Sequence, residues 1–174
     1  MEPQRVDRVE QLFAEHARAV RAYALRRVDT ATAEDVVSDV FVVAFRRLED
    51  VPETALPWLL ATARRIIANY RRAASRRERL SVELRPLHAG VWSDAPAGNA
   101  LLTGLSRLSE SDREVILLVA WDELSPEDAA AVVGCSRATF AVRLHRARRR
   151  LEAVMGQQQR AENLPRRLTE ATSE

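Results

Sequence analysis

The side chains with the clearest chemical potential in this sequence are its arginines, which gather in two stretches. Residues 137–151 contain six arginines and no acidic residue, whereas residues 110–128 contain seven acidic residues and one arginine. Exposed surfaces usually mix the two signs of charge, so a helix of one sign favours a phosphate-rich partner such as nucleic acid. The alternative is an ordinary helical hairpin whose basic face is only solvated.

A second basic stretch covers residues 64–79, where seven arginines are interrupted by a single acid, Glu78. Tyr70 lies among these arginines, next to Asn69. An aromatic side chain within a basic strip can stack on an unpaired base, although Tyr70 can equally be a half-buried core residue. The two stretches together predict two nucleic-acid-binding surfaces.

A predicted helix-turn-helix at residues 125–151 positions the first of these surfaces. Ser125 is a favoured N-cap with Pro126 at the first helical position, Gly134 supplies the turn, and Ser136 can cap the second helix. In the second helix the apolar residues recur at steps of 4, 3 and 4, which makes one buried face of Phe140, Leu144, Ala147 and Leu151. The arginines are left for the other faces.

The rest of the chain is also helical in pattern, so the sequence predicts an all-α fold. Alanine and leucine dominate, while the 174 residues include only five glycines. Further helices are predicted at about 6–28, 32–48, 57–80, 101–108 and 109–121, with Thr32 and Ser109 as N-caps.

The pattern divides the chain into two small helical domains joined by a flexible linker. A stretch with prolines and glycines but little helical period separates them, and the last stretch lacks an apolar stripe. The predicted parts are a first domain at 6–80, a linker at 81–98, a second domain at 99–155 and a disordered tail at 156–174.

Several classes of function are excluded by composition. The single cysteine, Cys135, cannot form a disulfide within the chain, and His16 is an isolated histidine without the partners that a metal site needs. No apolar run reaches about 18 residues and the N-terminus is polar, so we expect a cytoplasmic protein without a signal peptide or membrane span. No phosphate-binding glycine loop or nucleophile–base pair is evident, so we expect neither catalysis nor a cofactor.

Four segments carry a family resemblance. They are Ala33–Phe41 (AEDVVSDVF), the helix Trp58–Arg72, Leu105–Leu108 with Arg113–Val115, and residues 125–151 with the Leu-His-Arg-Ala signature at 144–147. In this order, with a linker between the second and the third, they resemble the bacterial RNA polymerase sigma factors of the extracytoplasmic-function (ECF) group. These are compact sigma-70 proteins that have only the second and fourth domains of the family.

The resemblance implies a promoter-specificity subunit whose partners are core RNA polymerase, promoter DNA and an anti-sigma factor. The helix at 32–48 would dock on a coiled coil of the largest polymerase subunit through Asp35, Ser38, Asp39 and Phe41. The loop at 49–56 and the helix after it would hold the melted −10 strand through Arg64, Arg65, Asn69, Tyr70 and Arg72. The recognition helix would enter the major groove at the −35 element through Ser136, Arg137, Thr139, Phe140, Arg143 and Arg146.

Three positions depart from the family pattern. Ser38 stands where glutamine is usual, which bears on the polymerase contact, and Arg65 stands where asparagine is usual, which bears on promoter preference. Phe140 replaces a smaller aliphatic residue and can simply repack the core.

The alternative function is a stand-alone helix-turn-helix regulator in which residues 1–80 serve dimerisation or sensing. That regulator would bind a palindromic duplex tightly by itself, whereas a sigma factor alone would bind promoter duplex poorly.

Overall fold

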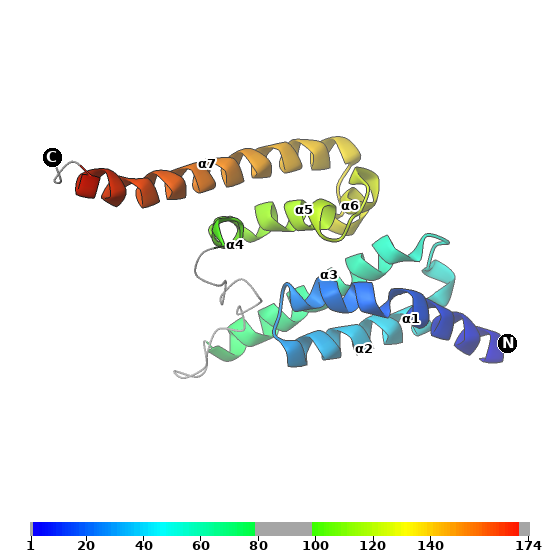
Figure 1. Ribbon diagram of the computed structural model, residues 1–174. Helices are drawn as coiled ribbons and strands as arrows, with labels where there is room; N and C mark the ends of the chain where they lie inside the picture. Colours follow the sequence, from blue (N-terminus) through cyan, green and yellow to red (C-terminus); the bar gives the residue numbers. More distant parts are fainter. Residues whose placement is uncertain (1, 79–98, 171–174) are drawn as a thin grey trace.

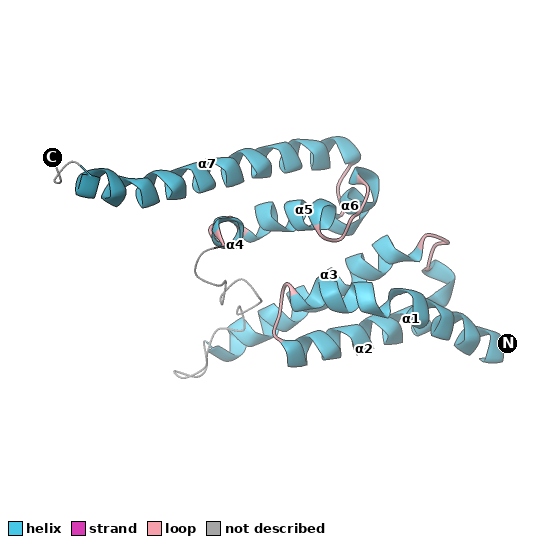
Figure 2. Cartoon of the chain, viewed as in Figure 1, coloured by secondary structure: helices cyan, strands magenta, loops and turns pink. Residues whose placement is uncertain are grey.

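The computed structural model describes residues 2–78 and 99–170, and these ranges consist of helices and short connections (Figures 1 and 2). In chain order the elements are α1 (Glu2–Leu25), α2 (Thr30–Arg46), the 3-10 turn η1 (Leu48–Asp50), α3 (Ala55–Glu78), α4 (Ala100–Ser106), α5 (Glu110–Ala120), α6 (Pro126–Val133) and α7 (Arg137–Glu170). The predicted all-α fold is confirmed. The predicted linker at 81–98, which includes Trp92, lies outside the described residues.

Helices α1, α2 and α3 form the first module, in which each helix packs against the other two. They lie side by side in the lower half of Figure 1. In α2 the apolar residues recur at helical spacing, so one face of the helix is buried against its neighbours. That buried face includes Val36, Val37, Val40, Phe41 and Ala44.

Asp29 caps the start of α2, whereas the sequence pattern predicted Thr32. The Asp29 carboxylate accepts hydrogen bonds from the backbone N–H of Thr32 at 3.0 Å and from its hydroxyl at 2.7 Å. The helix therefore begins at Thr30, and Thr32 lies within its first turn. These hydrogen bonds favour the ionised carboxylate, so they hold the pKa of Asp29 below its usual value despite some opposition from burial.

Helices α4 to α7 form the second module, whose predicted caps are present. The hydroxyl oxygens of Ser109 and Ser125 accept hydrogen bonds from backbone N–H groups three residues later, at 3.2 and 3.1 Å. Pro126 occupies the first turn of α6. The helix ends at Gly134, whose φ of 73° lies in the left-handed region that glycine adopts at little cost.

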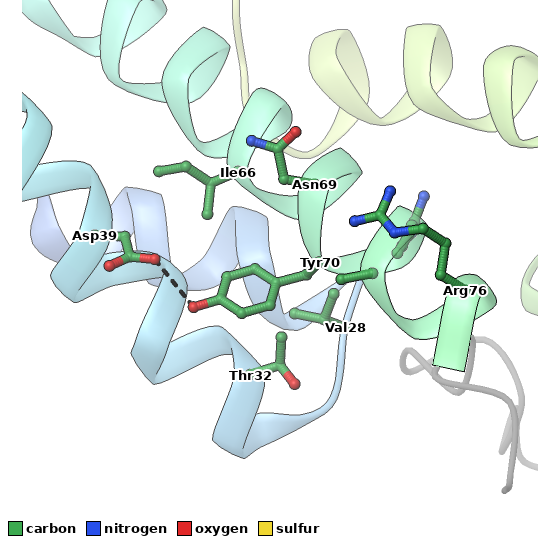
Figure 3. A pocket seen from close by; sticks show the side chains of 9 residues that line it. Val28, Thr32, Asp39, Ile66, Asn69, Tyr70 and Arg76 are labelled. Atoms are coloured by element: carbon green, nitrogen blue, oxygen red, sulfur yellow. Dashed lines mark hydrogen bonds between the residues drawn. The ribbon is translucent and has the colours of Figure 1, made fainter. Parts of the chain in front are cut away.

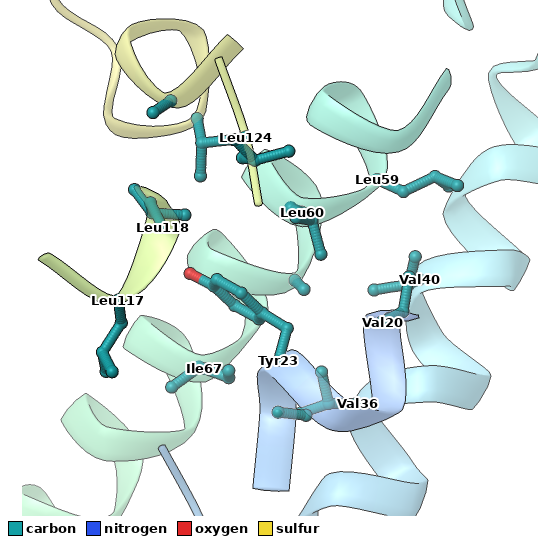
Figure 4. Packing of buried hydrophobic residues seen from close by; sticks show 14 of the residues in the cluster. Val20, Tyr23, Val36, Val40, Leu59, Leu60, Ile67, Leu117, Leu118 and Leu124 are labelled. Carbon is teal, nitrogen blue, oxygen red and sulfur yellow. The ribbon is translucent and has the colours of Figure 1, made fainter. Parts of the chain in front are cut away.

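The two modules pack against each other. Helix α3 lies against α6, and the buried residues form one continuous cluster that draws on both modules. Figure 4 shows Tyr23 and Ile67 of the first module facing Leu117, Leu118 and Leu124 of the second. This shared core was not predicted, because the sequence pattern favoured two domains separated by a flexible linker.

Helix α7 differs from its predicted end. It continues to Glu170, through residues 156–170, for which a disordered tail was predicted. The absence of an apolar stripe led to that prediction. However, residues 157–162 are glutamine, arginine, alanine and glutamate, which have high helix propensity and can extend a helix that is already nucleated.

The Asp29 cap leads to a prediction about stability. Asp29→Ala should lower the free energy of unfolding by about 1 kcal/mol, because α2 loses its N-terminal hydrogen-bond acceptor. The pKa of Asp29 is lowered in the folded state, so the loss should be complete at neutral pH and shrink as the pH falls through that lowered pKa. Chemical denaturation between neutral and acidic pH measures both effects. Thr30→Ala, at an exposed neighbouring position, is the control, and equal stability of the two variants would contradict the assignment of the cap.

Candidate nucleic-acid interface

Helices α6 and α7 form the predicted helix-turn-helix. The Ser136 hydroxyl oxygen accepts a hydrogen bond from the backbone N–H of Thr139 at 3.2 Å, so it caps α7 as predicted. Phe140, Leu144 and Ala147 are buried in the core, and Leu151 is partly buried against it, which confirms the predicted stripe. The stripe fixes the rotation of α7 about its axis and thereby turns the arginine-bearing side outward.

Most side chains predicted to contact a −35 element are exposed, namely Ser136, Arg137, Thr139, Arg143 and Arg146. Within this set, Thr139, Arg143 and Arg146 follow at steps of four and three, so they share one face of α7. Phe140 is the exception, because its side chain is 0% exposed. A side chain enclosed in the core cannot contact a base, so the prediction that Phe140 contacts DNA is corrected to a packing role.

Helix α3 carries the second basic surface. Arg64, Arg65, Asn69 and Arg72 are exposed and Tyr70 is half-buried. The Arg72 guanidinium donates a hydrogen bond to the Asn69 side-chain carbonyl, which orders the two groups next to each other. The structure therefore places the residues predicted for the −10 strand on one helix and leaves most of them accessible.

Tyr70 lies beside a cavity of about 410 Å³ between α2 and α3 (Figure 3). Its hydroxyl donates a hydrogen bond to Asp39 Oδ2 at 3.0 Å. This bond to a carboxylate raises the pKa of the Tyr70 phenol, with smaller contributions from burial and from nearby acids. Tyr70 is thus half-buried, and its ring also borders the cavity. Its stacking on an unpaired base stays a prediction. The bond also joins a residue predicted to bind DNA to one predicted to bind the polymerase.

The face of α2 predicted to bind the polymerase is acidic and largely accessible. Asp35, Ser38 and Asp39 are exposed. Phe41 is only 7% exposed, and its ring makes an edge contact with the ring of Phe13, with the centroids 4.8 Å apart. The prediction that Phe41 contacts a partner directly is therefore corrected: Phe41 is a packing residue that supports Phe13, which is half exposed.

A buried group of charged side chains joins the two modules, and it was not predicted. Arg27 Nε donates to Glu114 Oε2 at 2.7 Å, and the Tyr23 hydroxyl donates to Glu114 Oε1 at 2.7 Å. The Arg27 guanidinium also lies over the Tyr23 ring, 3.4 Å from its centroid. One carboxylate of α5 is thus held by two side chains of the first module.

Further ion pairs extend this contact on both sides. Arg26 pairs with Asp122, and Arg71 of α3 pairs with Glu110 at the start of α5. Arg71 Nη2 also donates to the backbone carbonyl of Arg27 at 2.9 Å. We call the whole group the inter-module clamp, and its members are Tyr23, Arg26, Arg27, Arg71, Glu110, Glu114 and Asp122.

Burial changes the acid–base properties of the clamp. It raises the pKa of the Asp122 carboxyl, although the charges of Arg27 and Arg26 act in the opposite direction. Burial is also the largest of the causes that raise the pKa of the Tyr23 phenol well above its usual value. Tyr23 is therefore a neutral hydrogen-bond donor at physiological pH. The adjacent arginines at the end of α1 and the acid-rich residues 110–128 were the only sequence signals of this contact.

Two other kinds of site are missing from the described ranges. No group of three potential metal-ligating side chains comes together there. None of the helices there is long and apolar enough to cross a membrane.

Comparison with known proteins identifies both modules. Residues 12–77 match the family model for sigma-70 region 2, and residues 98–151 match that for sigma-70 region 4. The ECF RNA polymerase sigma factor SigL of Mycobacterium tuberculosis (strain ATCC 25618 / H37Rv) is 33% identical over 156 residues, covering 83% of this chain and 86% of SigL. The chain belongs to the ECF sigma factors. A second relative, EcfG of Rhodopseudomonas palustris, is 31% identical over 146 residues, which is 79% of each chain.

The structural comparison agrees with this sigma-factor assignment. The sigma factor RpoE of Bartonella quintana, solved with the anti-sigma factor NepR, matches with a TM-score of 0.65 and 26% identity, covering 84% of this chain and 96% of RpoE. The protein is thus a sigma factor that binds core RNA polymerase and directs promoter recognition, and the alternative of a stand-alone regulator is not favoured.

The buried position of Phe140 leads to a prediction that separates packing from DNA contact. Phe140→Ala should lower the free energy of unfolding by about 3–5 kcal/mol, because it leaves a cavity under the sigma factor's recognition helix. Arg137→Ala, at an exposed site one turn away, should change stability by less than about 0.5 kcal/mol. Denaturant unfolding measures both values. Unchanged stability of the Phe140→Ala variant would contradict the packing role.

Proposed function

We propose that this sigma factor holds a promoter at two points, with α7 at the −35 element and α3 at the −10 strand. The observation that carries the proposal is that each module exposes one arginine-rich helix face. At the −35 element, arginines are suited to the guanine edge and to phosphates, and hydroxyls near a helix N-terminus are suited to phosphates. The proposed contacts on α7 are Ser136, Arg137, Thr139, Arg143 and Arg146.

At the −10 element the partner is a single strand, and α3 offers the groups that such a strand needs. Arg64, Arg65 and Arg72 are exposed cations that can follow the phosphate backbone. Tyr70 has a half-exposed ring on which a base can stack, and Asn69 beside it has an amide that can pair with a base edge. We assign these five residues to the melted strand.

Core polymerase docks on α2 in this proposal. The exposed residues Asp35, Ser38 and Asp39 form a short acidic face that suits a basic partner surface. The exposed ring of Phe13, supported by Phe41, adds apolar contact area next to it. We assign this combined surface to the coiled coil of the largest polymerase subunit.

An anti-sigma factor is a further proposed partner. RpoE of Bartonella quintana was solved with the anti-sigma factor NepR, and CnrH, which is 28% identical with a TM-score of 0.57, was solved with the cytosolic domain of CnrY. A comparable protein would silence this sigma factor by covering its binding faces. We also propose that the sigma factor acts in the cytoplasm and has no catalytic activity of its own.

The DNA contacts on α7 can be tested by transcription. Sequencing the transcripts that are induced when the sigma factor is overproduced will supply its promoter. With core polymerase on that promoter, the double variant Arg143→Ala/Arg146→Ala should initiate at least about tenfold less often, and the slope of log affinity against log salt should fall by about two. Arg148→Ala, on the opposite face of α7 and exposed, is the matched control. Equal initiation by the double variant and the control would rule out these contacts.

A further inference from the structure

The recognition helix α7 carries an exposed apolar side chain, Val142. This residue is 51% exposed, the highest value among the large apolar residues that are exposed in the described ranges. Single apolar residues are common on protein surfaces, but this one lies on a helix whose exposed side is otherwise rich in arginine. A valine can neither pair with a phosphate nor hydrogen-bond to a base, so the polar contacts proposed on α7 leave its role unexplained.

The buried stripe of α7 determines where Val142 points. Val142 lies two positions after Phe140 and two positions before Leu144, which are only 0% and 8% exposed. An α-helix has about 3.6 residues per turn, so residues two positions apart point to nearly opposite sides. Val142 therefore points almost directly away from the core of the second module. Figure 1 shows α7 along the outer edge of the molecule, with the other helices of its module on one side.

The residues that share this outward side of α7 fit the groove of a duplex. Four exposed residues follow one another at steps of four, four and three, which places them on one side of the helix. They are Ala138, Val142, Arg146 and Arg149. The short side chain of Ala138 lets the first turn approach a surface closely. Arg146 and Arg149 can reach phosphates, which leaves Val142 at the centre of the contact.

The base edges of the major groove offer one apolar group, the C5 methyl of thymine. The other groups that the base edges present there are hydrogen-bond donors and acceptors. A valine cannot satisfy these polar groups, and it would displace the water that does, at a cost in free energy. A valine in the middle of a recognition helix therefore favours a thymine over the other three bases.

We propose that Val142 reads a thymine of the −35 element by packing against its C5 methyl group. Val142 is then a specificity-determining residue, and the arginines beside it hold the backbone on either side. The inference rests on the function proposed above, because it assumes that α7 enters the major groove at the −35 element. The contact buries about one methyl group, which corresponds to about fourfold in affinity.

Removal of a single methyl group from the DNA tests this contact. Deoxyuridine pairs as thymidine does but lacks the C5 methyl group. Each thymine of the −35 element, on either strand of the promoter found by transcript sequencing, is replaced in turn by uracil. Competition binding then measures the affinity of each duplex for core polymerase carrying the sigma factor. The sigma factors compared are the unsubstituted protein, Val142→Ala, and the matched control Val6→Ala, which shortens another valine that is 40% exposed on α1.

One uracil replacement should weaken binding about fourfold for the unsubstituted sigma factor and for Val6→Ala. The same replacement should have no effect on the Val142→Ala variant, because the methyl group has already lost its partner. A −35 element in which no uracil replacement weakens binding would overturn the proposal. An effect of uracil that persists unchanged in Val142→Ala would overturn it as well.

The variant Arg143→Ala/Arg146→Ala separates failure of the valine contact from failure of the proposed function. If this variant binds the promoter as tightly as the unsubstituted sigma factor does, α7 does not hold the −35 element and both proposals fail. If it binds more weakly while every uracil replacement is without effect, only the contact of Val142 with thymine is overturned.

Discussion

The packing of the two modules depends on one part-buried carboxylate, Glu114, and the groups that hold it. Removing a buried ion's partner leaves an uncompensated charge and typically costs about 3–5 kcal/mol, whereas full separation returns both ions to water. The Arg27–Glu114 pair is thus costly to mutate on one side but can open as a unit. The Tyr23 hydroxyl bonds the second Glu114 oxygen, and Arg27 Nη1 donates to the Tyr23 backbone carbonyl. Arg27 Nη2 makes no hydrogen bond and lies 3.6 Å from Asp122 Oδ2. The packing of the two modules therefore depends on both partners of this pair being present.

Local features of this fold could be predicted from the sequence because local chemistry determines them. The caps at Ser109, Ser125 and Ser136, the left-handed glycine at Gly134 and the buried stripe of α7 each depend on residues within a few positions of one another. The predicted N-cap of α2 was wrong for an equally local reason. Asp29 and Thr32 are both good N-cap residues within one turn, and the sequence pattern could not rank them. The predicted end of α7 was wrong because a segment without an apolar stripe can still be helical when its residues have high helix propensity.

The candidate site was predictable only in part. The exposed arginines of α3 and α7 could be predicted from the charge pattern and the helical period, because both properties can be read from the sequence alone. Phe41 and Phe140 were assigned to binding sets by family position, although the periodic stripe had already indicated that Phe140 is buried. The clamp could not be predicted, because it depends on which acid of residues 110–128 meets which arginine of a module far away in sequence. Burial against a distant helix has no signature in local spacing.

The most direct measurement of the central claim is the distance between the modules in the free sigma factor, with Glu114 present and with Glu114 replaced by glutamine. Dyes at Glu10→Cys in α1 and Glu152→Cys in α7, in a Cys135→Ser background, report this distance by energy transfer, and both chosen sites are exposed. The account predicts one population with high transfer in the free sigma factor and a fall in transfer in the Glu114→Gln variant, because Arg27 then loses the carboxylate that it pairs with. Low transfer in the unsubstituted protein, or transfer that Glu114→Gln leaves unchanged, would contradict the account.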